Sequence, residues 1–340
     1  MELVPIDPDA GDDHPLLRRA AERLRAGGLV AFPTETVYGL GAHALDEAAV
    51  ARIYAAKGRP AHNPVIVHVA DAQAARAVVA EWTPHAELLA RRFWPGPLTL
   101  VLPKGADVPA SVVAGLAKVG VRVPAHPLAL ALLRAARVPV AAPSANRSNE
   151  VSPTTARHVV ESLEGADVLV LDGGACSVGI ESTVVDVSGP RPVLLRPGGV
   201  ARDELERALG VPIATVEEVR DDAPRAAPGM LKKHYSTRAP LATTPHGDLA
   251  ALRARLLRAP TPRAALVFES AARELRGEPL VVAMPDDPRA YARRLYAALR
   301  ELDARAPALI VVESPPPGVA WDALRDRLSR AAAGADDAAG

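Results

Sequence analysis

Two cations stand two residues apart in the segment KGRPAHNP, residues 57–64. Pro60 favours an extended backbone at Arg59, so the side chains of Lys57 and Arg59 can project to the same side. Two adjacent cations would neutralise a chain of phosphates, and arginine can bind two oxygens at once. The pair also follows an expected helix, where it could simply complement the helix dipole. The motif alone leaves both interpretations open.

Hydroxyl, amide and glycine residues follow the ends of several expected strands. They occur in PTETVYGLGAHA (33–44) and in VAAPSANRSNEVSPT (140–154), where Ser144 and Asn146 alternate onto one face. Loops beyond strand ends are the usual ligand site of α/β sheets, and glycines there suit a close backbone approach to a ligand. Each segment could equally be a polar turn that satisfies its own backbone.

Three further segments carry unusual residues. LDGGACSVGIESTVVD (171–186) places glycines before Ser182, and its backbone N–H groups could wrap a phosphate or a carboxylate. Arg196 ends an expected strand. PGMLKKHYS (228–236) concentrates Met, Tyr, His and two of only five lysines in an otherwise irregular stretch. That concentration predicts a connector that docks over the pocket of the first domain.

Composition narrows the class of protein. The 340 residues include 49% hydrophobic and 24% charged side chains, which are globular values. Forty basic and forty acidic residues give a net charge of zero, which disfavours a protein that coats nucleic acid. A single cysteine, Cys176, excludes an internal disulfide and a cysteine zinc cluster. The acidic N-terminus is no signal peptide, and no apolar run reaches the length of a membrane span. We therefore expect a cytoplasmic protein.

His62 and His68 lack nearby carboxylates or thiols, which disfavours a histidine metal site.

Apolar periodicity predicts an α/β architecture with a mixed sheet. Short apolar runs predict strands at 29–32, 65–69, 98–102, 119–123, 138–142, 167–171, 182–187 and 191–196. Helical spacing predicts helices near 15–26, 46–57, 71–80, 84–93, 127–137, 154–163 and 201–209.

The alternating pattern stops after Gly210 and resumes near residue 249. We expect a catalytic domain over 1–210, an extended linker or lid over 211–245, a small α/β domain over 246–332 and a disordered tail over 333–340.

At these residues the sequence resembles the YrdC-like L-threonylcarbamoyladenylate synthases in their long, two-domain form. The resemblance rests on PTETVYGLGA, KGRP with NPVIVH, VGVRVP, APSAN, GIESTVVD, LLRPG and PGMLKKHY, in this order. It implies a YrdC-like twisted mixed sheet with flanking helices and a small Rossmann-like C-terminal domain.

The resemblance also implies a reaction. L-Threonine, bicarbonate or CO2, and ATP would give threonylcarbamoyl-AMP and pyrophosphate, with Mg²⁺ bound through the ATP phosphates. The product would pass to the tRNA threonylcarbamoyl transferase machinery, the first step towards N6-threonylcarbamoyladenosine. Direct binding of tRNA would be weak.

Residue roles follow from the resemblance position by position. The threonine-binding residues would be Thr34, His68, Arg122, Ala142 and Ser182. The ATP-binding residues would be Arg59, Asn63, Ser144, Asn146, Ser152, Arg196 and Tyr235, with Lys118 as a further candidate. Lys57 and Arg59 would stabilise charge on the phosphates, and no covalent nucleophile is expected.

Physical reasoning agrees with these roles. A carboxylate needs a cation, and an arginine on a strand such as Arg122 can bind it through two hydrogen bonds. Both the carbamate and its mixed anhydride react with water, so a lid that includes Lys232, Lys233 and Tyr235 would protect them.

Two alternatives belong to other classes. One is a tRNA- or double-stranded-RNA-binding YrdC-like module without synthase activity, which the zero net charge disfavours. The other is a hydrogenase-maturation carbamoyltransferase, which would carry cysteine zinc motifs that one cysteine cannot supply.

Overall fold

The computed structural model describes residues 1–216, 234–275 and 280–333. The chain divides into two compact units. The first unit comprises Met1–Ser148, Pro153–Ser177 and Glu181–Met230. The second comprises Asn149–Ser152, Val178–Ile180 and Leu231–Gly340. Two short loop segments of the N-terminal half therefore group with the C-terminal part of the chain.

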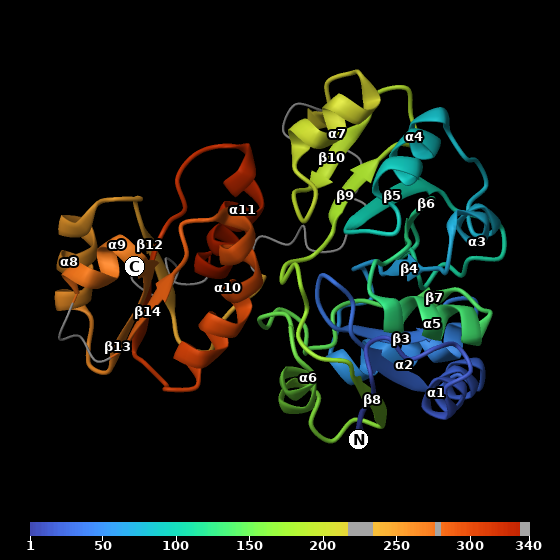
Figure 1. Ribbon diagram of the computed structural model, residues 1–340, viewed down its shortest axis with the longest axis horizontal. Coiled ribbons are helices and arrows are strands. Elements are labelled where there is room, and N and C mark those ends of the chain that lie inside the picture. The colour runs from blue at the N-terminus through green and yellow to red at the C-terminus, as the bar shows by residue number, and fades with distance from the viewer. Residues whose placement is uncertain (217–233, 276–279, 334–340) are drawn as a thin grey trace. The chain divides into compact units, whose positions relative to one another are not determined.

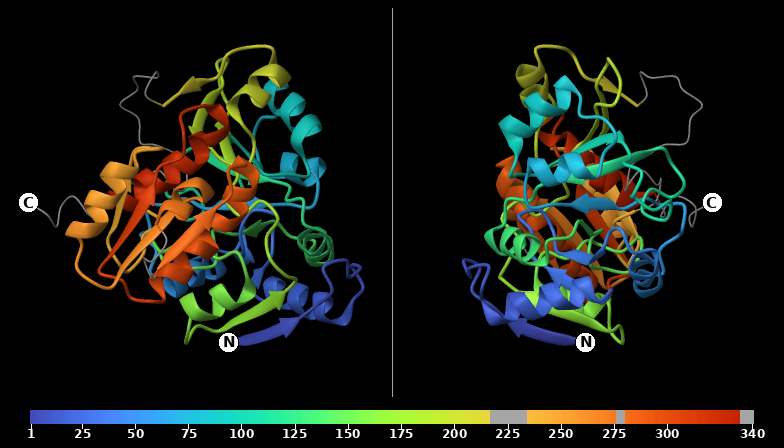
Figure 2. Two further views of the ribbon diagram at one scale, coloured as in Figure 1. Left: turned by 60° about the vertical axis from the view of Figure 1, so that its left-hand side comes forward. Right: turned by 90° about the vertical axis from the view of Figure 1, so that its right-hand side faces the viewer.

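The first unit is built on one mixed sheet of eleven strands, in the order β1-β8-β2-β3-β7-β4-β6-β5-β9-β10-β11. The strands are β1 (Glu2–Pro5), β2 (Leu29–Phe32), β3 (Gly39–His43), β4 (Ile66–His68), β5 (Leu98–Pro103), β6 (Lys118–Arg122), β7 (Val140–Ala141), β8 (Val168–Asp172), β9 (Thr183–Asp186), β10 (Val193–Arg196) and β11 (Ala214–Thr215). Parallel pairs such as β4–β6 and antiparallel pairs such as β5–β6 occur in the same sheet. Strand β1 lies at its outer edge, and the N-terminus is peripheral in both views of Figure 2.

Helices flank this sheet and begin where the sequence offers caps. They are α1 (Pro15–Arg25), α2 (Glu47–Lys57), α3 (Ala72–Ala77), α4 (Pro84–Phe93), α5 (Pro127–Ala136), α6 (Ala156–Ser162) and α7 (Arg202–Leu209). The Asp46 side chain accepts hydrogen bonds from the N–H groups of Ala48 and Ala49 and starts α2. Gly58 ends α2 in the left-handed conformation, with φ of 57°. The cap therefore fixes Lys57 as the last helical residue.

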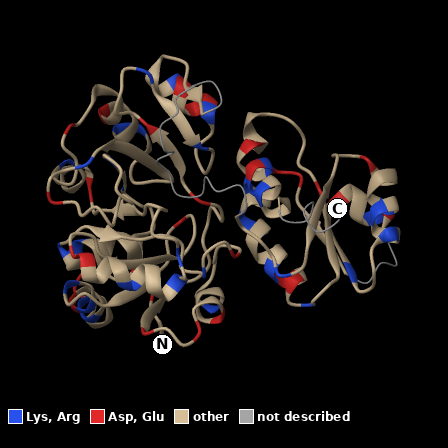
Figure 3. Cartoon of the chain, turned by 180° about the vertical axis from the view of Figure 1, so that it is seen from behind, with Lys and Arg blue, Asp and Glu red and all other residues tan. Residues whose placement is uncertain are grey.

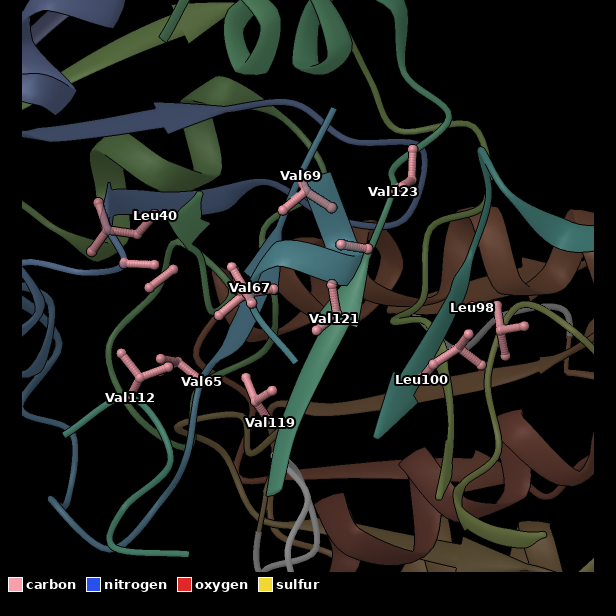
Figure 4. Close-up of a cluster of buried hydrophobic side chains, with 14 of the residues drawn as sticks. Leu40, Val65, Val67, Val69, Leu98, Leu100, Val112, Val119, Val121 and Val123 are labelled. Carbon is pink, nitrogen blue, oxygen red and sulfur yellow. The ribbon is translucent and has the colours of Figure 1, made fainter. Parts of the chain in front are cut away.

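One face of the central strands is apolar. Side chains alternate between the two faces of a strand, and Val65, Val67 and Val69 share one face of the β4 segment. Val119, Val121 and Val123 share the corresponding face of β6, and Figure 4 shows them beside the valines of β4. All six are buried in one hydrophobic core with α2, α4 and α7. Burial of this face leaves the intervening residues of β4 and β6 on the opposite face.

The opposite face carries α1 and α5 over one half of the sheet. Leu17, Leu24, Leu128 and Leu132 of these helices share a second core with residues of β2, β7 and β8. The ring of Phe32 lies in this core.

Strand β3 is a difference from the sequence prediction, which placed residues 39–44 in a ligand loop. Gly39 and Gly41 lie in β3 and pair with β2. A Cβ at Gly41 would lie 2.8 Å from the ring of Phe32 and 2.9 Å from Val140. These glycines therefore make room for a neighbouring side chain rather than for a ligand.

The second unit contains a four-stranded parallel sheet in the order β12-β15-β13-β14, flanked by helices (Figure 1). Its elements are β12 (Leu241–Thr244), α8 (Leu249–Arg258), β13 (Arg263–Phe268), α9 (Glu269–Glu274), β14 (Val281–Met284), α10 (Pro288–Asp303), β15 (Leu309–Glu313) and α11 (Asp322–Ala332). Parallel strands joined by helices are the Rossmann-like arrangement that the resemblance implies. The predicted fold class is confirmed for both units. Strands β11 and β12 lie inside the range 211–245 expected to be an extended linker.

The distribution of charged side chains agrees with the zero net charge of the sequence. In the view of Figure 3, Lys and Arg are interspersed with Asp and Glu along the helices. Within the described ranges, no helix is both long enough and apolar enough to cross a membrane.

Candidate active site

Two candidate residues end neighbouring strands. His68 and Arg122 are the last residues of β4 and β6, and they are paired in the parallel register. The β5–β6 register, continued by one residue, brings Thr99 opposite Arg122. Registered partners project from the same face of a sheet. Thr99, Arg122 and His68 therefore form one row, called here the His68 row, on the face opposite the valine core.

The guanidinium of Arg122 is buried and bound on several sides. Its Nε donates to the Gly96 carbonyl at 3.1 Å, and Nη1 donates to Thr36 Oγ1 at 2.9 Å. Its Nη2 forms an ion pair with Glu35 at 2.6 Å, and both side chains are less than 10% exposed. A buried cation is thus balanced by a buried carboxylate.

Thr34 organises the turn that supplies these partners. Its hydroxyl donates to the Val37 carbonyl at 2.6 Å and accepts from the N–H groups of Thr36 and Val37. It also lies 2.8 Å from the Thr36 hydroxyl. The turn therefore connects Thr34 to Arg122 through Thr36.

His68 is an uncharged member of the row. Burial, with a smaller effect of the Arg122 cation, lowers the pKa of His68 to about 3. Its ring meets Phe32 edge-on, and its Nδ1 has no hydrogen-bond partner among the described residues. A neutral imidazole with a buried nitrogen can exchange one hydrogen bond with a ligand.

Ser182 and Arg196 lie along the same edge of the sheet as Arg122, the edge formed by the ends of the strands rather than by an outer strand. Strand β5 is antiparallel to β6, β9 is parallel to β5, and β10 is antiparallel to β9. Arg196, the last residue of β10, and Ser182, just before β9, therefore share this edge. Arg196 donates to the Ser182 carbonyl through Nε at 3.2 Å and Nη2 at 2.9 Å.

The Ser182 hydroxyl connects this pair to the His68 row. It lies 2.8 Å from the Thr99 hydroxyl and accepts from Arg196 Nη2 at 3.2 Å. A Cβ at Gly198 would lie 2.4 Å from Thr183 N. Glycine is therefore required where the loop after Arg196 passes the backbone of Thr183.

Apolar residues occupy the centre of the same face. Gly120 pairs with Ile66 in the register, and the N–H of Ala142 donates to the Ile66 carbonyl at 2.9 Å. Ala142 is buried. Ile66 lies between Gly120 and Ala142 in the register, so the middle of this face consists of a glycine, an isoleucine and an alanine.

A second row lies at the other end of this face, two residues beyond the pair of Ile66 and Gly120. Continuing the β4–β6 and β4–β7 registers brings Lys118, Pro64 and Ser144 side by side. An isolated bridge between Gly39 and Ser144 agrees with this placement. We call this set the Ser144 row. Four residues of strand separate it from the His68 row, which corresponds to about 13 Å. Lys118 forms an ion pair with Asp186 at 2.7 Å.

Lys57 and Arg59 both converge on the Ser144 row. Lys57 is 2% exposed, and its Nζ donates to the carbonyls of Ser144 and Asn146. Arg59 donates through Nε to the Asn63 carbonyl at 3.1 Å and through Nη2 to the Pro64 carbonyl at 2.7 Å. The two cations therefore bind main-chain oxygens of two neighbours in this row, Ser144 and Pro64.

Two buried amides border this row. Asn63 Nδ2 has no hydrogen-bond partner among the described residues, and Asn146 Nδ2 donates to the Arg147 carbonyl at 2.9 Å. An unsatisfied buried donor is uncommon in proteins and points to a ligand acceptor.

Two expected ATP-binding residues belong to the second unit. Ser152 is buried within its segment Asn149–Ser152. Tyr235 is buried, with its ring stacked on Tyr296 at 5.7 Å and under Arg327 at 5.1 Å. Lys232 and Lys233, expected in the lid, lie outside the described residues.

Sequence reasoning gave no binding role to three polar residues of the site. These are Glu35 and Thr36, which contact Arg122, and Thr99, which joins Ser182. Glu35 and Thr36 stand beside Thr34 in PTETVYGLGAHA, a segment already selected for its hydroxyl groups, so their position was a usable signal. The only signal for Thr99 was that it is a polar residue inside an apolar strand.

The described residues include no group of three His, Cys, Asp or Glu side chains that could hold a metal ion. Cys176 is buried, and burial raises the pKa of its thiol, which keeps it protonated.

This fold and this face define a class: an α/β protein with a twisted mixed sheet, a Rossmann-like second unit, and buried cations and hydroxyls gathered on one sheet face. Two family models match the chain. The model of Sua5, YciO and YrdC, described as "Telomere recombination", matches residues 22–198. A model described as "Threonylcarbamoyl-AMP synthase, C-terminal domain" matches residues 200–333. The chain belongs to the Sua5/YciO/YrdC family, which confirms the family predicted from the sequence.

Curated relatives and a solved structure agree. A threonylcarbamoyl-AMP synthase of Pyrococcus abyssi is 51% identical over 223 residues, 65% of this chain and 65% of that protein. One of Bacillus subtilis is 46% identical over 242 residues, 71% of this chain and 70% of that protein. The crystal structure of P. abyssi Sua5 complexed with L-threonine superposes with a TM-score of 0.87 at 39% identity. It covers 98% of both chains. These relatives support the predicted synthase and an enzyme of nucleotidyl-transfer type.

Proposed function

We propose that the protein condenses L-threonine, bicarbonate or CO2, and ATP to threonylcarbamoyl-AMP and pyrophosphate. The observation that carries the proposal is the strand register. In this register His68 and Arg122 share one face with Lys118 and Ser144, in two rows about 13 Å apart, which supports the proposal. An amino acid at one row and a nucleotide at the other would meet over Ile66, Gly120 and Ala142, which lie between them.

Threonine binds at the His68 row in this proposal. The Arg122 guanidinium receives its carboxylate, because arginine binds a carboxylate through two parallel hydrogen bonds. Thr34, His68 and Ser182 supply hydroxyl and imidazole groups around the amino acid. Ala142 leaves space because its side chain is only a methyl group.

ATP binds at the Ser144 row. Arg59 faces the phosphates at this row, and Arg196, which lies beside Ser182 at the His68 end, would face the part of ATP that reaches the threonine. Asn63, Ser144 and Asn146 donate hydrogen bonds, with Lys118 as a further candidate. Lys57 acts here chiefly by holding the Ser144–Asn146 backbone, which its Nζ contacts. Ser152 and Tyr235, which both belong to the second unit, remain ATP-binding residues in this proposal.

The chemistry needs no protein nucleophile. The ammonium group of threonine releases one proton to solvent, the neutral amine nitrogen bonds to the carbon of CO2, and the adduct releases a second proton to solvent, which gives a carbamate. A carbamate oxygen then bonds to the α-phosphorus of ATP, and the bond to the β-phosphate oxygen breaks to release pyrophosphate. Alignment of the reactants can lower the barrier by about 7–11 kcal/mol. The arginines stabilise charge that develops on the phosphates.

Mg²⁺ would be carried by the ATP phosphates. Apart from the Asp186 carboxylate, which is paired with Lys118, the groups described at the Ser144 row are cations and amides, which do not fit a dedicated magnesium site. The ion would offset phosphate charge when it is bound, and the roles assigned to the protein's residues do not depend on it.

The proposal extends to the cell. The water-labile product would pass to the tRNA threonylcarbamoyl transferase machinery in the cytoplasm, and direct binding of tRNA would be weak.

The test is incubation with L-threonine, labelled bicarbonate and ATP. We expect pyrophosphate release that depends on threonine, together with a labelled adenylate. Nucleotide turnover without a labelled adenylate would contradict the proposal. A steep salt dependence of RNA binding without any adenylate would favour the RNA-binding module instead.

A further inference from the structure

Glu35 is a buried acid to which the proposed reaction assigns no role. It is 6% exposed, and its Oε1 lies 2.6 Å from Arg122 Nη2. Neither carboxylate oxygen of Glu35 has a geometrically aligned hydrogen bond among the described residues, and both are buried from solvent. Desolvating a carboxylate without full hydrogen bonding is costly, so this arrangement calls for an explanation.

Arg122 presents three of its five N–H groups to protein oxygens in this state. Its Nε faces Gly96, Nη1 faces Thr36 and Nη2 faces Glu35. A substrate carboxylate that binds at Nη2, where the ion pair lies, competes with Glu35 for the guanidinium. The Gly96 carbonyl belongs to the backbone and Thr36 is held in the Thr34 turn. Glu35 is the partner that a competing carboxylate can replace directly, because it presents the same chemical group.

The buried pair offers one positive and one negative group, and an amino-acid zwitterion carries one group that complements each of them. We propose that Glu35 binds the ammonium group of the substrate amino acid, while the substrate carboxylate replaces Glu35 on Arg122. Both buried charges keep an opposite partner throughout this exchange, and the net charge of the site does not change. The inference rests on the proposed function and makes Glu35 the residue that selects ligands bearing an α-amine.

A purely structural role for Glu35 makes a different prediction. If Glu35 only orients Arg122, its loss should weaken every ligand that carries a carboxylate by the same factor. If it binds the ammonium group, its loss should weaken only ligands that carry the amine. The comparison of two ligands that differ by the amine therefore separates the two roles.

The experiment measures calorimetric dissociation constants of the full chain for L-threonine and for (R)-3-hydroxybutyrate, which is threonine without its amine. We expect the wild type to prefer threonine by roughly 10- to 100-fold, the range for a hydrogen bond to a charged group. In Glu35→Gln, which keeps the shape of the side chain, the preference should fall to within about threefold.

Thr36→Val is the matched control, because it removes a neutral partner of Arg122 and leaves Glu35 in place. It should weaken both ligands alike and preserve the preference. ATP affinity of each variant checks that the fold is intact.

A preference that survives in Glu35→Gln would overturn the inference. A wild type that binds both ligands equally would overturn it without any variant, even if Glu35→Gln does not fold. A wild type that does not bind threonine at all would instead overturn the proposed function, and the inference with it.

Discussion

Lys57 Nζ donates to the main-chain carbonyls of Ser144 and Asn146, residues 87 and 89 positions away in the sequence. The N–H of Ser148 returns a hydrogen bond to the Lys57 carbonyl at 2.8 Å. Three hydrogen bonds thus join the end of α2 to the loop after β7. A lysine expected to meet phosphates directly also shapes the loop that carries Ser144 and Asn146.

Lys57→Met should lower the free energy of unfolding by about 2–3 kcal/mol, because it leaves buried carbonyls without their charged donor. It should also weaken ATP binding roughly tenfold, since the loop loses its anchor. Urea denaturation and calorimetry measure the two effects. Lys104→Met is the control, because Lys104 also donates to main-chain carbonyls but in the loop between β5 and β6. Equal loss of ATP affinity in both variants would contradict the assignment.

The two arginines at the same sheet edge should separate by ligand. Arg122→Lys retains the charge but loses the paired hydrogen bonds, so threonine affinity should fall about 10- to 100-fold and ATP affinity should stay within about threefold. Arg196→Lys should show the reverse. Calorimetric titration of each variant with each ligand provides the measurement. If both variants weaken the same ligand, the assignment of Arg122 to threonine and of Arg196 to ATP is wrong.

His68 should make the protein less stable in acid. Its folded pKa of about 3 lies below the ordinary value of 6.5, so the unfolded chain binds this proton first as the pH falls. The contribution is complete above pH 6.5 and is lost progressively as the pH decreases towards about 3. Between pH 7 and 5 the loss is on the order of 2 kcal/mol.

In His68→Gln that part of the pH dependence should disappear from urea-denaturation curves at pH 7 and 5. His62→Gln, at an exposed position, should keep it. An unchanged slope in His68→Gln would show that the imidazole is not buried in its neutral form.

Tyr235 offers a way to separate packing from nucleotide contact. Its ring stacks on Tyr296 and lies under Arg327, so Tyr235→Ala should cost about 3–5 kcal/mol of stability within the second unit. Tyr235→Phe keeps the ring and should remain within about 1 kcal/mol of the wild type. If the hydroxyl contacts nucleotide, Tyr235→Phe should still lower the yield of adenylate. Normal synthesis and normal ATP affinity in the Phe variant would remove Tyr235 from the nucleotide site.

Cys176 should be unreactive in the folded protein. It is 2% exposed, and burial raises the pKa of its thiol, so little thiolate is present at pH 8. Iodoacetamide should label it only after unfolding, as followed by mass spectrometry. Rapid labelling of the native protein would show that the core around Cys176 opens readily.

The two-domain architecture was predictable because it depends on local patterns. Alternation in VIVHV and KVGVR already marks one apolar face, and the structure buries those valines in the core. The ordered motifs were sufficient to predict the family, and the family models confirm it. Strand β3 escaped prediction because two of its five residues are glycines, which a strand tolerates here only to admit the ring of Phe32.

What only the tertiary structure decided is which side chains meet. Arg122 was predicted to bind a carboxylate, but its partner Glu35 lies 87 positions earlier in a different segment. Lys57 and Arg59 were predicted to project together, yet each binds a different pair of carbonyls. Strand order and register determine such contacts, and both depend on packing across the whole sheet. The sequence alone therefore established the kinds of groups in the site, and the fold determined their partners.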